Sequence, residues 1–415
     1  MDDLRGAQAS QGRAPLPIPG PRRQRARRRT GKMTQHWDAI VVGLGGLGTV
    51  VSHDLAAAGL STLGLDRFQP GHDRGSSHGA TRVIRKAYFE HPDYVPLLHR
   101  SYERWFSLEE KTSQSLFFQS GVLELGPEFG EVVPGVLRAA AQHQLKVEAL
   151  SGQEVEARFP GIKGLDEANL VGVYEPDGGY LLVEDCVRAW FDQATNAGAN
   201  LRWGAAVTHW GTHRDGFEVV FGEERFTCTR LVLCPGAWAS QLLPKTFAQH
   251  LQVKRKPLLW YEAGPRYLER GGFPVWLFEL PGGVFYGFPT RDRMGFKAAR
   301  HSAGLDVSDP LQLDRNLHSY DRDPVEAFLK KHLPDVETEQ LNHHAVCMYT
   351  LSPDLHPLVG EIEPGLVVAA GLSGHGFKMV PGLGEAIAQI ARGEAPNCAL
   401  DIFRPRRFIA PPKPL

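Results

Sequence analysis

The segment Gly43-Leu44-Gly45-Gly46-Leu47-Gly48 constrains the fold of this 415-residue chain more than any other feature. It follows the apolar run 39–42 and precedes a helix-like stretch, so it marks a strand–turn–helix junction. In this spacing the first glycine permits a tight turn, the second lets backbone approach a pyrophosphate, and the third lets the helix pack on the sheet. Asp66 ends the next apolar run, where a ribose hydroxyl needs a carboxylate acceptor. The pattern predicts that these glycines and Asp66 bind a dinucleotide.

The length and composition of the chain indicate a folded protein of more than one domain. At 415 residues it exceeds what one hydrophobic core usually serves. Hydrophobic residues make up 42% and charged residues 22%, which is ordinary for a globular protein. No apolar stretch is long enough to span a bilayer. We therefore expect two domains, and neither a membrane protein nor a disordered one.

The charge is unevenly distributed along the chain. Residues 1–32 contain nine Arg and Lys against Asp2 and Asp3, whereas the remainder contains 37 basic and 45 acidic residues. The basic segment is rich in Pro, Gly and Arg, has no amphipathic period and lacks the apolar region of a secretory signal. We expect a disordered leader, an over-long start that precedes a domain opening at Met33. A nucleic-acid-binding arm or a transit peptide is the alternative.

The cysteines of the chain number five and are widely spaced, at Cys186, Cys228, Cys234, Cys347 and Cys398. An odd, scattered set predicts neither a disulfide framework nor a zinc site. We therefore expect no metal and a reducing, cytoplasmic location.

Hydrophobic periodicity indicates an α/β fold in which the nucleotide-binding domain is interrupted by a second domain. An apolar stripe at helical spacing predicts a core-facing helix that carries Tyr94, Leu97, Leu98, Tyr102, Trp105 and Leu108. Further helices are expected at 133–143 and 184–197, the latter capped by Gly198, and strands at 121–125, 170–174, 217–221 and 226–233.

Regularly spaced strands separated by Gly and Pro turns predict an antiparallel sheet in the second domain. They are expected at 257–262, 275–280, 284–288 and 294–298. We predict that the Rossmann-type domain comprises 34–112, 183–247 and 353–410, and that the substrate domain comprises 113–182 and 248–352.

A second glycine-rich turn occurs near the end of the chain. The strand-like run 366–370 leads into Gly371-Leu-Ser-Gly-His-Gly-Phe-Lys378 and then into a helix expected at 380–392. A helix N-terminus at this point suits the negative charge that a reduced isoalloxazine ring carries near N1 and C2=O.

Three segments resemble those of the monomeric sarcosine oxidase and N-methyltryptophan oxidase family. They are Gly75-Ser-Ser-His-Gly-Ala-Thr-Arg-Val-Ile-Arg-Lys-Ala-Tyr88, Ala345-Val-Cys-Met-Tyr-Thr350 and the turn 371–378. The likeness runs from about Trp37 to Phe408. It implies FAD and a two-domain, D-amino-acid-oxidase-like architecture with a Rossmann-type FAD-binding domain. It also implies oxidation of secondary amino acids by O2 to an imine and H2O2, so an N-methyl substrate would yield formaldehyde and the primary amino acid.

The resemblance also implies roles for individual residues. Cys347 resembles the cysteine that forms a thioether with the flavin, and Arg82 and His78 resemble residues that lie against the ring. Arg85 and Lys378 resemble a pair that binds the substrate carboxylate. Lys297 resembles an oxygen-activating lysine. The other expected site residues are Tyr286, Tyr349 and His301 at the substrate, and Ser76, Gly374, His375, Gly376 and Lys378 at the cofactor.

Elementary chemistry gives each of these residues an ordinary alternative. A cysteine in an apolar run is usually inert, and an arginine is commonly an ion-pair partner. Lys297 is a lone charge among small and apolar neighbours, and a fixed cation there would stabilise developing superoxide. Four residues of straight strand would separate Lys297 from His301 by roughly 13 Å, so both reach one site only if the strand bends or ends.

Two departures from the family pattern leave the substrate open among sarcosine, N-methyltryptophan, pipecolate and related imino acids. Ala80 replaces the usual Asp, and the stretch 352–359 replaces a more acidic, aromatic one. We expect a monomer that binds a small amino acid and O2, without nucleic acid or membrane partners. An oxidase of cyclic imino acids such as pipecolate or proline is the alternative. More remote are an NAD(P)-dependent dehydrogenase and a nucleic-acid-binding protein that uses the basic leader.

Overall fold

The computed structural model describes residues 35–409. The leader predicted at 1–32 lies outside the described residues. The five cysteines all lie inside them, and all are free thiols, as predicted. No helix within 35–409 is long and apolar enough to cross a membrane.

The first large sheet has eight strands and contains the glycine turn. Its order is β10-β11-β12-β1-β2-β9, with β19 beside β12 and β18 beside β19. The pairs β1–β2, β1–β12, β2–β9 and β12–β19 are parallel, as a Rossmann-type core requires. The strands are β1 (Gln35–Val42), β2 (Thr62–Leu65), β9 (Asn200–Arg202), β10 (Val207–His213), β11 (Gly216–Phe221), β12 (Glu224–Leu233), β18 (Leu358–Glu363) and β19 (Leu366–Ala370).

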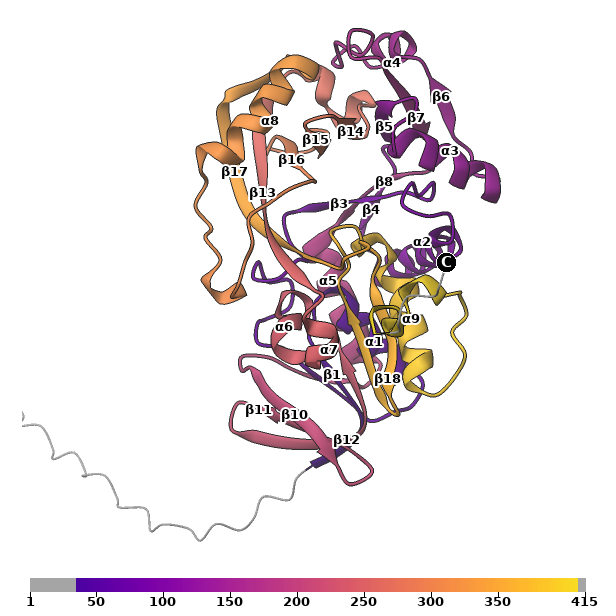
Figure 1. Ribbon diagram of the computed structural model, residues 1–415, viewed down its shortest axis with the longest axis vertical. Coiled ribbons are helices and arrows are strands. Elements are labelled where there is room, and N and C mark those ends of the chain that lie inside the picture. The colour runs from indigo at the N-terminus through magenta and orange to yellow at the C-terminus, as the bar shows by residue number, and fades with distance from the viewer. Residues whose placement is uncertain (1–34, 410–415) are drawn as a thin grey trace, which may run out of the picture. The chain divides into compact units, whose positions relative to one another are not determined.

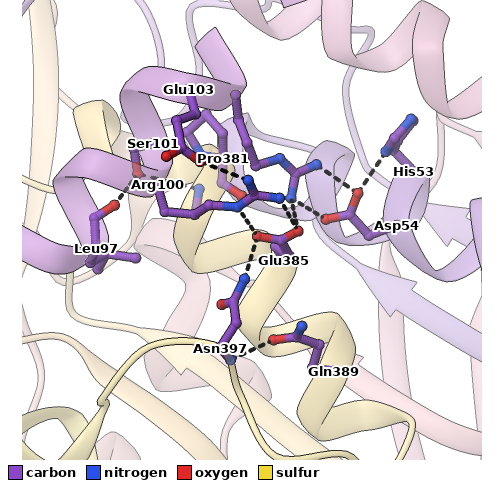
Figure 2. A network of polar contacts seen from close by, with 12 residues as sticks. His53, Asp54, Leu97, Arg100, Ser101, Glu103, Pro381, Glu385, Gln389 and Asn397 are labelled. Atoms are coloured by element: carbon purple, nitrogen blue, oxygen red, sulfur yellow. Dashed lines mark hydrogen bonds and ion pairs between the residues drawn. The ribbon is translucent and has the colours of Figure 1, made fainter. Parts of the chain in front are cut away.

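Two helices, α1 (Gly46–Ala57) and α9 (Val380–Ala391), pack on this sheet, and two more, α2 (Tyr94–Thr112) and α5 (Val183–Asn196), pack against them. The predicted stripe on α2 is buried in the same core as α1 and α9. Polar contacts add to this packing, since Arg104 forms two 2.7 Å hydrogen bonds with Asp54 of α1, and Arg100 donates to Glu385 of α9 at 2.6 Å (Figure 2).

The second large sheet also has eight strands, in the order β17-β13-β16-β15-β14-β5-β7-β6. Helix α8 (Ser319–His332) lies beside β16 and β17 (Figure 1). The smaller helices α3 (Val132–His143) and α4 (Gly152–Arg158) flank β7. The strands are β5 (Val122–Pro127), β6 (Glu148–Leu150), β7 (Leu170–Glu175), β13 (Gln252–Ala263), β14 (Val275–Leu280), β15 (Gly283–Phe288), β16 (Phe296–Arg300) and β17 (Val336–Leu351).

The four strands predicted for this sheet, found as β13, β14, β15 and β16, pair antiparallel, as predicted. A parallel pair beside them was not predicted. β5 and β14 are parallel, with Glu124 opposite Leu277. The two strands are joined by a long intervening stretch of chain rather than by a hairpin, and a long connection allows parallel pairing. The predicted strand at 294–298 begins two residues later, at Phe296, because Gly295 has a φ of +99°.

A third sheet of three short strands was not predicted. It contains β3 (Thr81–Ile84), β8 (Gly179–Leu182) and β4 (Phe117–Phe118) in the order β3-β8-β4. Strand β3 carries Arg82, so this sheet fixes one of the expected site residues. The eight-stranded sheets draw their strands from different parts of the chain, which accords with the domain bounds above. Those bounds stay a prediction.

Candidate functional site

A cavity of about 420 Å³ lies over the glycine turn. Both predicted glycine-rich turns line it, although they are more than 300 residues apart in the sequence. It also contacts the ends of β2 and β12. The lining includes Gly43, Gly45, Gly48, Asp66, Arg67, Ser76, Arg82, Trp238, Tyr349, Gly371, Gly374, Gly376 and Val380.

The three glycines of the first turn have different surroundings. Gly43 has a φ of +93°, and a Cβ there would lie 2.2 Å from the carbonyl oxygen of Cys234. A Cβ at Gly48 would lie 1.7 Å from the carbonyl oxygen of Gly43, so α1 packs directly on the turn. At Gly45 the nearest atom would be Ser77 Oγ at 3.7 Å, and this glycine lines the cavity. Gly43 and Gly48 therefore serve the fold, whereas Gly45 leaves room for a ligand.

Charge at the turn favours a dinucleotide. The carboxylate of Asp66 accepts hydrogen bonds from the backbone N–H groups of Leu44 at 2.6 Å and Phe68 at 2.8 Å, which fixes it beside the turn. Helix α1 begins at the cavity without a side-chain cap at Gly45 and without an acidic residue in its first turn. The positive end of the helix dipole is thus available to a phosphate.

A second, smaller cavity of about 50 Å³ adjoins the first. Arg82, Tyr349, Gly374 and Phe377 line both. The second cavity brings together most of the expected substrate residues, namely Arg85, Lys378, Tyr286, Tyr349 and His301, with Phe89, Glu90, Val122, Glu124, Val275, Trp276, Leu277 and His375. His375 lies here rather than in the larger cavity.

Arg85 is buried and already has two protein carboxylates beside it. Its Nη2 donates to Glu90 Oε2 at 2.9 Å, and its Nε lies 2.9 Å from Glu124 Oε1. Burial opposes its charge, but Glu124 and Glu90 together raise the pKa of Arg85 above its ordinary value. The guanidinium also stacks over the rings of Tyr88 and Phe89. Sequence reasoning found Arg85 and missed both carboxylates.

Lys378 is the second cation of this cavity and has fewer partners. Its Nζ donates to the carbonyl oxygen of His375 at 2.7 Å and lies 3.4 Å from Tyr88 Oη. Burial, with the charge of Arg85, lowers the pKa of Lys378 to about 7. The imidazole of His375 is held by Tyr88 at 2.5 Å and by the carbonyl of Leu355 at 2.9 Å.

Two tyrosines and a histidine line the opposite wall. The hydroxyl of Tyr349 lies 3.4 Å from both Tyr286 Oη and His301 Nδ1. Burial, with the nearby charge of Lys256, lowers the pKa of His301 to about 3, so its ring is neutral. These three side chains supply neutral polar groups.

Cys347 lines neither cavity, but it contacts Arg82, which lines both. Its Sγ is fully buried, 3.3 Å from Arg82 Nη2 and 3.5 Å from the carbonyl oxygen of Ser76. Arg82 also donates to that carbonyl at 3.0 Å. Cys347 and Ser76 thus both contact the side chain of Arg82, which lines the cavities.

Lys297 does not line either cavity. Its buried Nζ donates to the carbonyl oxygens of Gly79 at 2.6 Å and Thr81 at 3.0 Å, and it lies over the rings of Phe288 and Trp260. Burial and the charge of Arg82 lower the pKa of Lys297 well below its ordinary value. Strand β16 ends at Arg300, so His301 turns into the small cavity while Lys297 points to the Gly79 loop. The structure thus places these two residues in different surroundings.

His78 lies near Lys297 and is equally buried. Its Nε2 has no hydrogen-bond partner among the described residues. Burial, with the charge of Arg82, lowers the pKa of His78 to about 3. It lines a third, open cavity with Gly79 and Trp260.

Comparison with known proteins identifies the family. Residues 38–390 match the family described as DAO, FAD dependent oxidoreductase. A monomeric sarcosine oxidase of Streptomyces avermitilis is 37% identical over 390 residues, which cover 92% of this chain and all of that protein. An N-methyl-L-tryptophan oxidase of Yersinia pestis is 32% identical, covering 90% of this chain and 99% of that protein.

Solved structures show the same fold. NikD, an amino acid oxidase of nikkomycin biosynthesis, superposes with a TM-score of 0.77 at 24% identity, covering 90% of this chain and 98% of that chain. Glycine oxidase from Geobacillus kaustophilus gives a TM-score of 0.74 at 19% identity, with 89% and 98% covered. The glycine turn, Asp66 and the helix N-terminus described above fit the nucleotide of FAD. The chain belongs to the FAD-dependent oxidoreductase family and is an amine oxidoreductase related to the monomeric sarcosine oxidases and N-methyl-L-tryptophan oxidases.

Proposed function

We propose that this protein oxidises a small N-methyl amino acid such as sarcosine, with FAD as cofactor and O2 as electron acceptor. The products are an imine, which water hydrolyses to formaldehyde and a primary amino acid, and H2O2. The observation that carries the proposal is the small cavity, because it adjoins the nucleotide cavity and contains the buried cations Arg85 and Lys378. Buried, paired cations are suited to a carboxylate.

The size of the small cavity favours a small substrate. Its volume is about 50 Å³, and Phe89, Val122, Trp276 and Leu277 form apolar walls. An indole side chain would have to displace these walls, whereas sarcosine carries no side chain. We therefore place sarcosine ahead of N-methyltryptophan.

FAD, when bound, accepts the two electrons that the substrate loses when a C–H bond next to its nitrogen is broken. The protein residues prepare the substrate for this step. Arg85 and Lys378 orient the carboxylate, while Tyr286, Tyr349 and His301 face the remainder of the cavity. The surrounding cations and the exclusion of water disfavour the ammonium form of the substrate, so the reactive neutral amine is favoured.

Two further roles belong to the same proposal. Cys347 forms the covalent link to FAD, which the contact of its Sγ with the cavity-lining side chain of Arg82 supports. Lys297 promotes the reaction with O2, which the burial of its amino group beside Arg82 supports.

A peroxide-coupled assay of the purified flavoprotein tests the proposal. Sarcosine, N-methyltryptophan, pipecolate and proline are compared at equal concentration, with glycine as the unmethylated control. We expect H2O2 and formaldehyde in equal amounts from sarcosine, and a far lower kcat/KM with N-methyltryptophan. Peroxide from pipecolate or proline with none from sarcosine would overturn the assignment to N-methyl substrates.

A further inference from the structure

A carboxyl group on β5 faces the small cavity from an otherwise apolar surface. Side chains alternate along the strand, so Val122 and Glu124 line the cavity, while Leu123 and Leu125 belong to the core on the other face. Val275 and Leu277 of the neighbouring strand β14 lie on the same surface. Glu124 is 1% exposed. A buried position such as that of Glu124 is usually occupied by a hydrophobic residue.

Arg85 is the cation in contact with Glu124, and the contact is a poor one. Arg85 Nε lies 2.9 Å from Glu124 Oε1, but the N–H does not point at the oxygen, so both atoms are without a hydrogen bond among the described residues. The aligned hydrogen bond of Arg85 goes to Glu90 instead. A buried carboxylate oxygen without a hydrogen bond is costly, which favours the neutral form of Glu124.

The charged groups around Glu124 determine how a bound substrate carboxylate would share Arg85 with the carboxyl groups of the protein. Arg85 and Lys378 are the facing cations, and Glu90 and Glu175 are the facing carboxylates. Arg82 also lines the cavity, as do Tyr286, Tyr349, His301 and His375. Low pKa values keep the imidazoles of His301 and His375 uncharged. An incoming carboxylate would therefore share Arg85 with Glu90 and Glu124. These three anions would repel one another, although the guanidinium groups of Arg85 and Arg82 and the ammonium group of Lys378 line the same cavity.

We propose that Glu124 is a substrate-binding residue that recognises the substrate carboxylate as a neutral carboxyl group, taking up one proton from solvent and donating its O–H to that carboxylate. The inference rests on the proposed function, because it requires that an amino-acid carboxylate enters this cavity. Hydrogen bonds from O–H to a carboxylate are short and strong, so the protonated group turns a repulsive neighbour into a donor. Burial raises the pKa of Glu124 to about 8, so this proton is available near neutrality.

The test measures protons rather than turnover. Methoxyacetate replaces the N–H of sarcosine by oxygen, cannot be oxidised as an amine and is ionised throughout the range used. Its binding to the holoenzyme is followed by titration calorimetry at pH 6 and pH 9 in two buffers of different ionisation enthalpy. Wild type is compared with Glu124→Gln, whose amide has nearly the same shape, donates a hydrogen bond and does not titrate.

At pH 9 we expect wild type to take up about one proton more per bound ligand than Glu124→Gln, and at pH 6 no difference. Lys378 can also take up a proton when an anion binds, and the charge of Glu124 affects its pKa, so the proton is assigned to Glu124 by the infrared band described below. At pH 6, affinity in Glu124→Gln should stay within about threefold of wild type, whereas Glu124→Leu, which lacks a donor, should bind about tenfold more weakly.

An infrared difference spectrum of the wild type alone gives a second reading that needs no variant. Binding at pH 9 should produce the C=O band of a neutral carboxyl. Binding of methoxyacetate with equal proton uptake in wild type and Glu124→Gln, or without this band, would overturn the role of Glu124 only. Failure of the wild-type holoenzyme to bind methoxyacetate at either pH would instead overturn the proposed function.

Discussion

The thiol of Cys347 and the guanidinium of Arg82 are in direct contact, with Sγ 3.3 Å from Nη2. Arg82 lines both cavities, so this contact joins the sulfur of Cys347 to the lining of the nucleotide cavity. We predict that Cys347→Ser abolishes covalent flavin attachment without unfolding the chain. Acid precipitation followed by fluorescence of the pellet measures the attached flavin.

Cys234 provides a matched control for that experiment. It lines the nucleotide cavity, which Cys347 does not, but burial raises its pKa to about 12. Cys234→Ser should therefore retain covalent flavin at the wild-type level. Flavin released entirely into the supernatant from wild type would contradict the link to Cys347.

Two glycines of the first turn should have different roles, one in folding and one in cofactor binding. We predict that Gly48→Ala fails to fold stably, because its Cβ would lie 1.7 Å from the backbone oxygen of Gly43. Gly45→Ala should fold, since the nearest atom would be 3.7 Å away, but its methyl group enters the cavity and should weaken FAD binding. Circular dichroism melting curves and bound flavin per chain distinguish the two effects. Equal loss of stability in both variants would contradict this division.

The sequence predicted those parts of the fold that depend on local periodicity. The helix at Tyr94–Thr112 and the strand at Leu366–Ala370 follow from regular apolar spacing, and both are confirmed. Strands β3, β4 and β8 were missed because each has at most four residues and is stabilised by pairing with distant chain. The parallel pair β5–β14 was missed for the same reason, since pairing partners far apart in sequence leave no local pattern.

The sequence predicted the basic residues of the candidate site but not its acidic residues. Arg85 and Lys378 occur in recognisable segments, and the structure brings them to one cavity. Glu124 lies in the run Val122–Leu125, where a charged residue among apolar ones was the available indication of a buried role. That it meets Arg85 follows only from the packing of β5 against the segment after β3.

We expect Lys378 to make the proposed binding of the substrate carboxylate dependent on pH. Its ammonium form is present below a pKa of about 7 and is lost as the pH rises. We predict that the affinity for methoxyacetate falls between pH 6 and pH 8 in wild type and changes less in Lys378→Arg, whose side chain stays charged. Lys378→Met should raise KM for the substrate at pH 6 by about 30-fold or more, corresponding to about 2 kcal/mol.

The methyl ester of the substrate is the matched control for Lys378. It lacks the carboxylate charge, so wild type and Lys378→Met should oxidise it equally poorly. An ester that wild type oxidises as well as the free acid would contradict carboxylate recognition by this cavity.

Because Lys297 lies outside the small cavity, its replacement should affect flavin reduction by the substrate and flavin reoxidation by O2 differently. Its Nζ contacts the Gly79 loop and not the substrate walls, so substrate oxidation should not need its charge. We predict that Lys297→Met is reduced by substrate under anaerobic conditions at a rate near that of wild type. Reoxidation by O2 should slow by about 10²–10³-fold, since a preorganised charge next to a developing anion contributes about 3–4 kcal/mol.

Stopped-flow absorbance of the flavin measures both rates on the same protein. Lys256→Met is the comparison, because Lys256 is a second buried lysine that bonds the carbonyl of His301 and lies over Tyr349, away from the Gly79 loop. Its loss should leave reoxidation at the wild-type rate. Slow anaerobic reduction with fast reoxidation in Lys297→Met would instead assign Lys297 to the oxidation of the amine. A charge that acts only on the reaction with O2 cannot affect flavin reduction in the absence of O2.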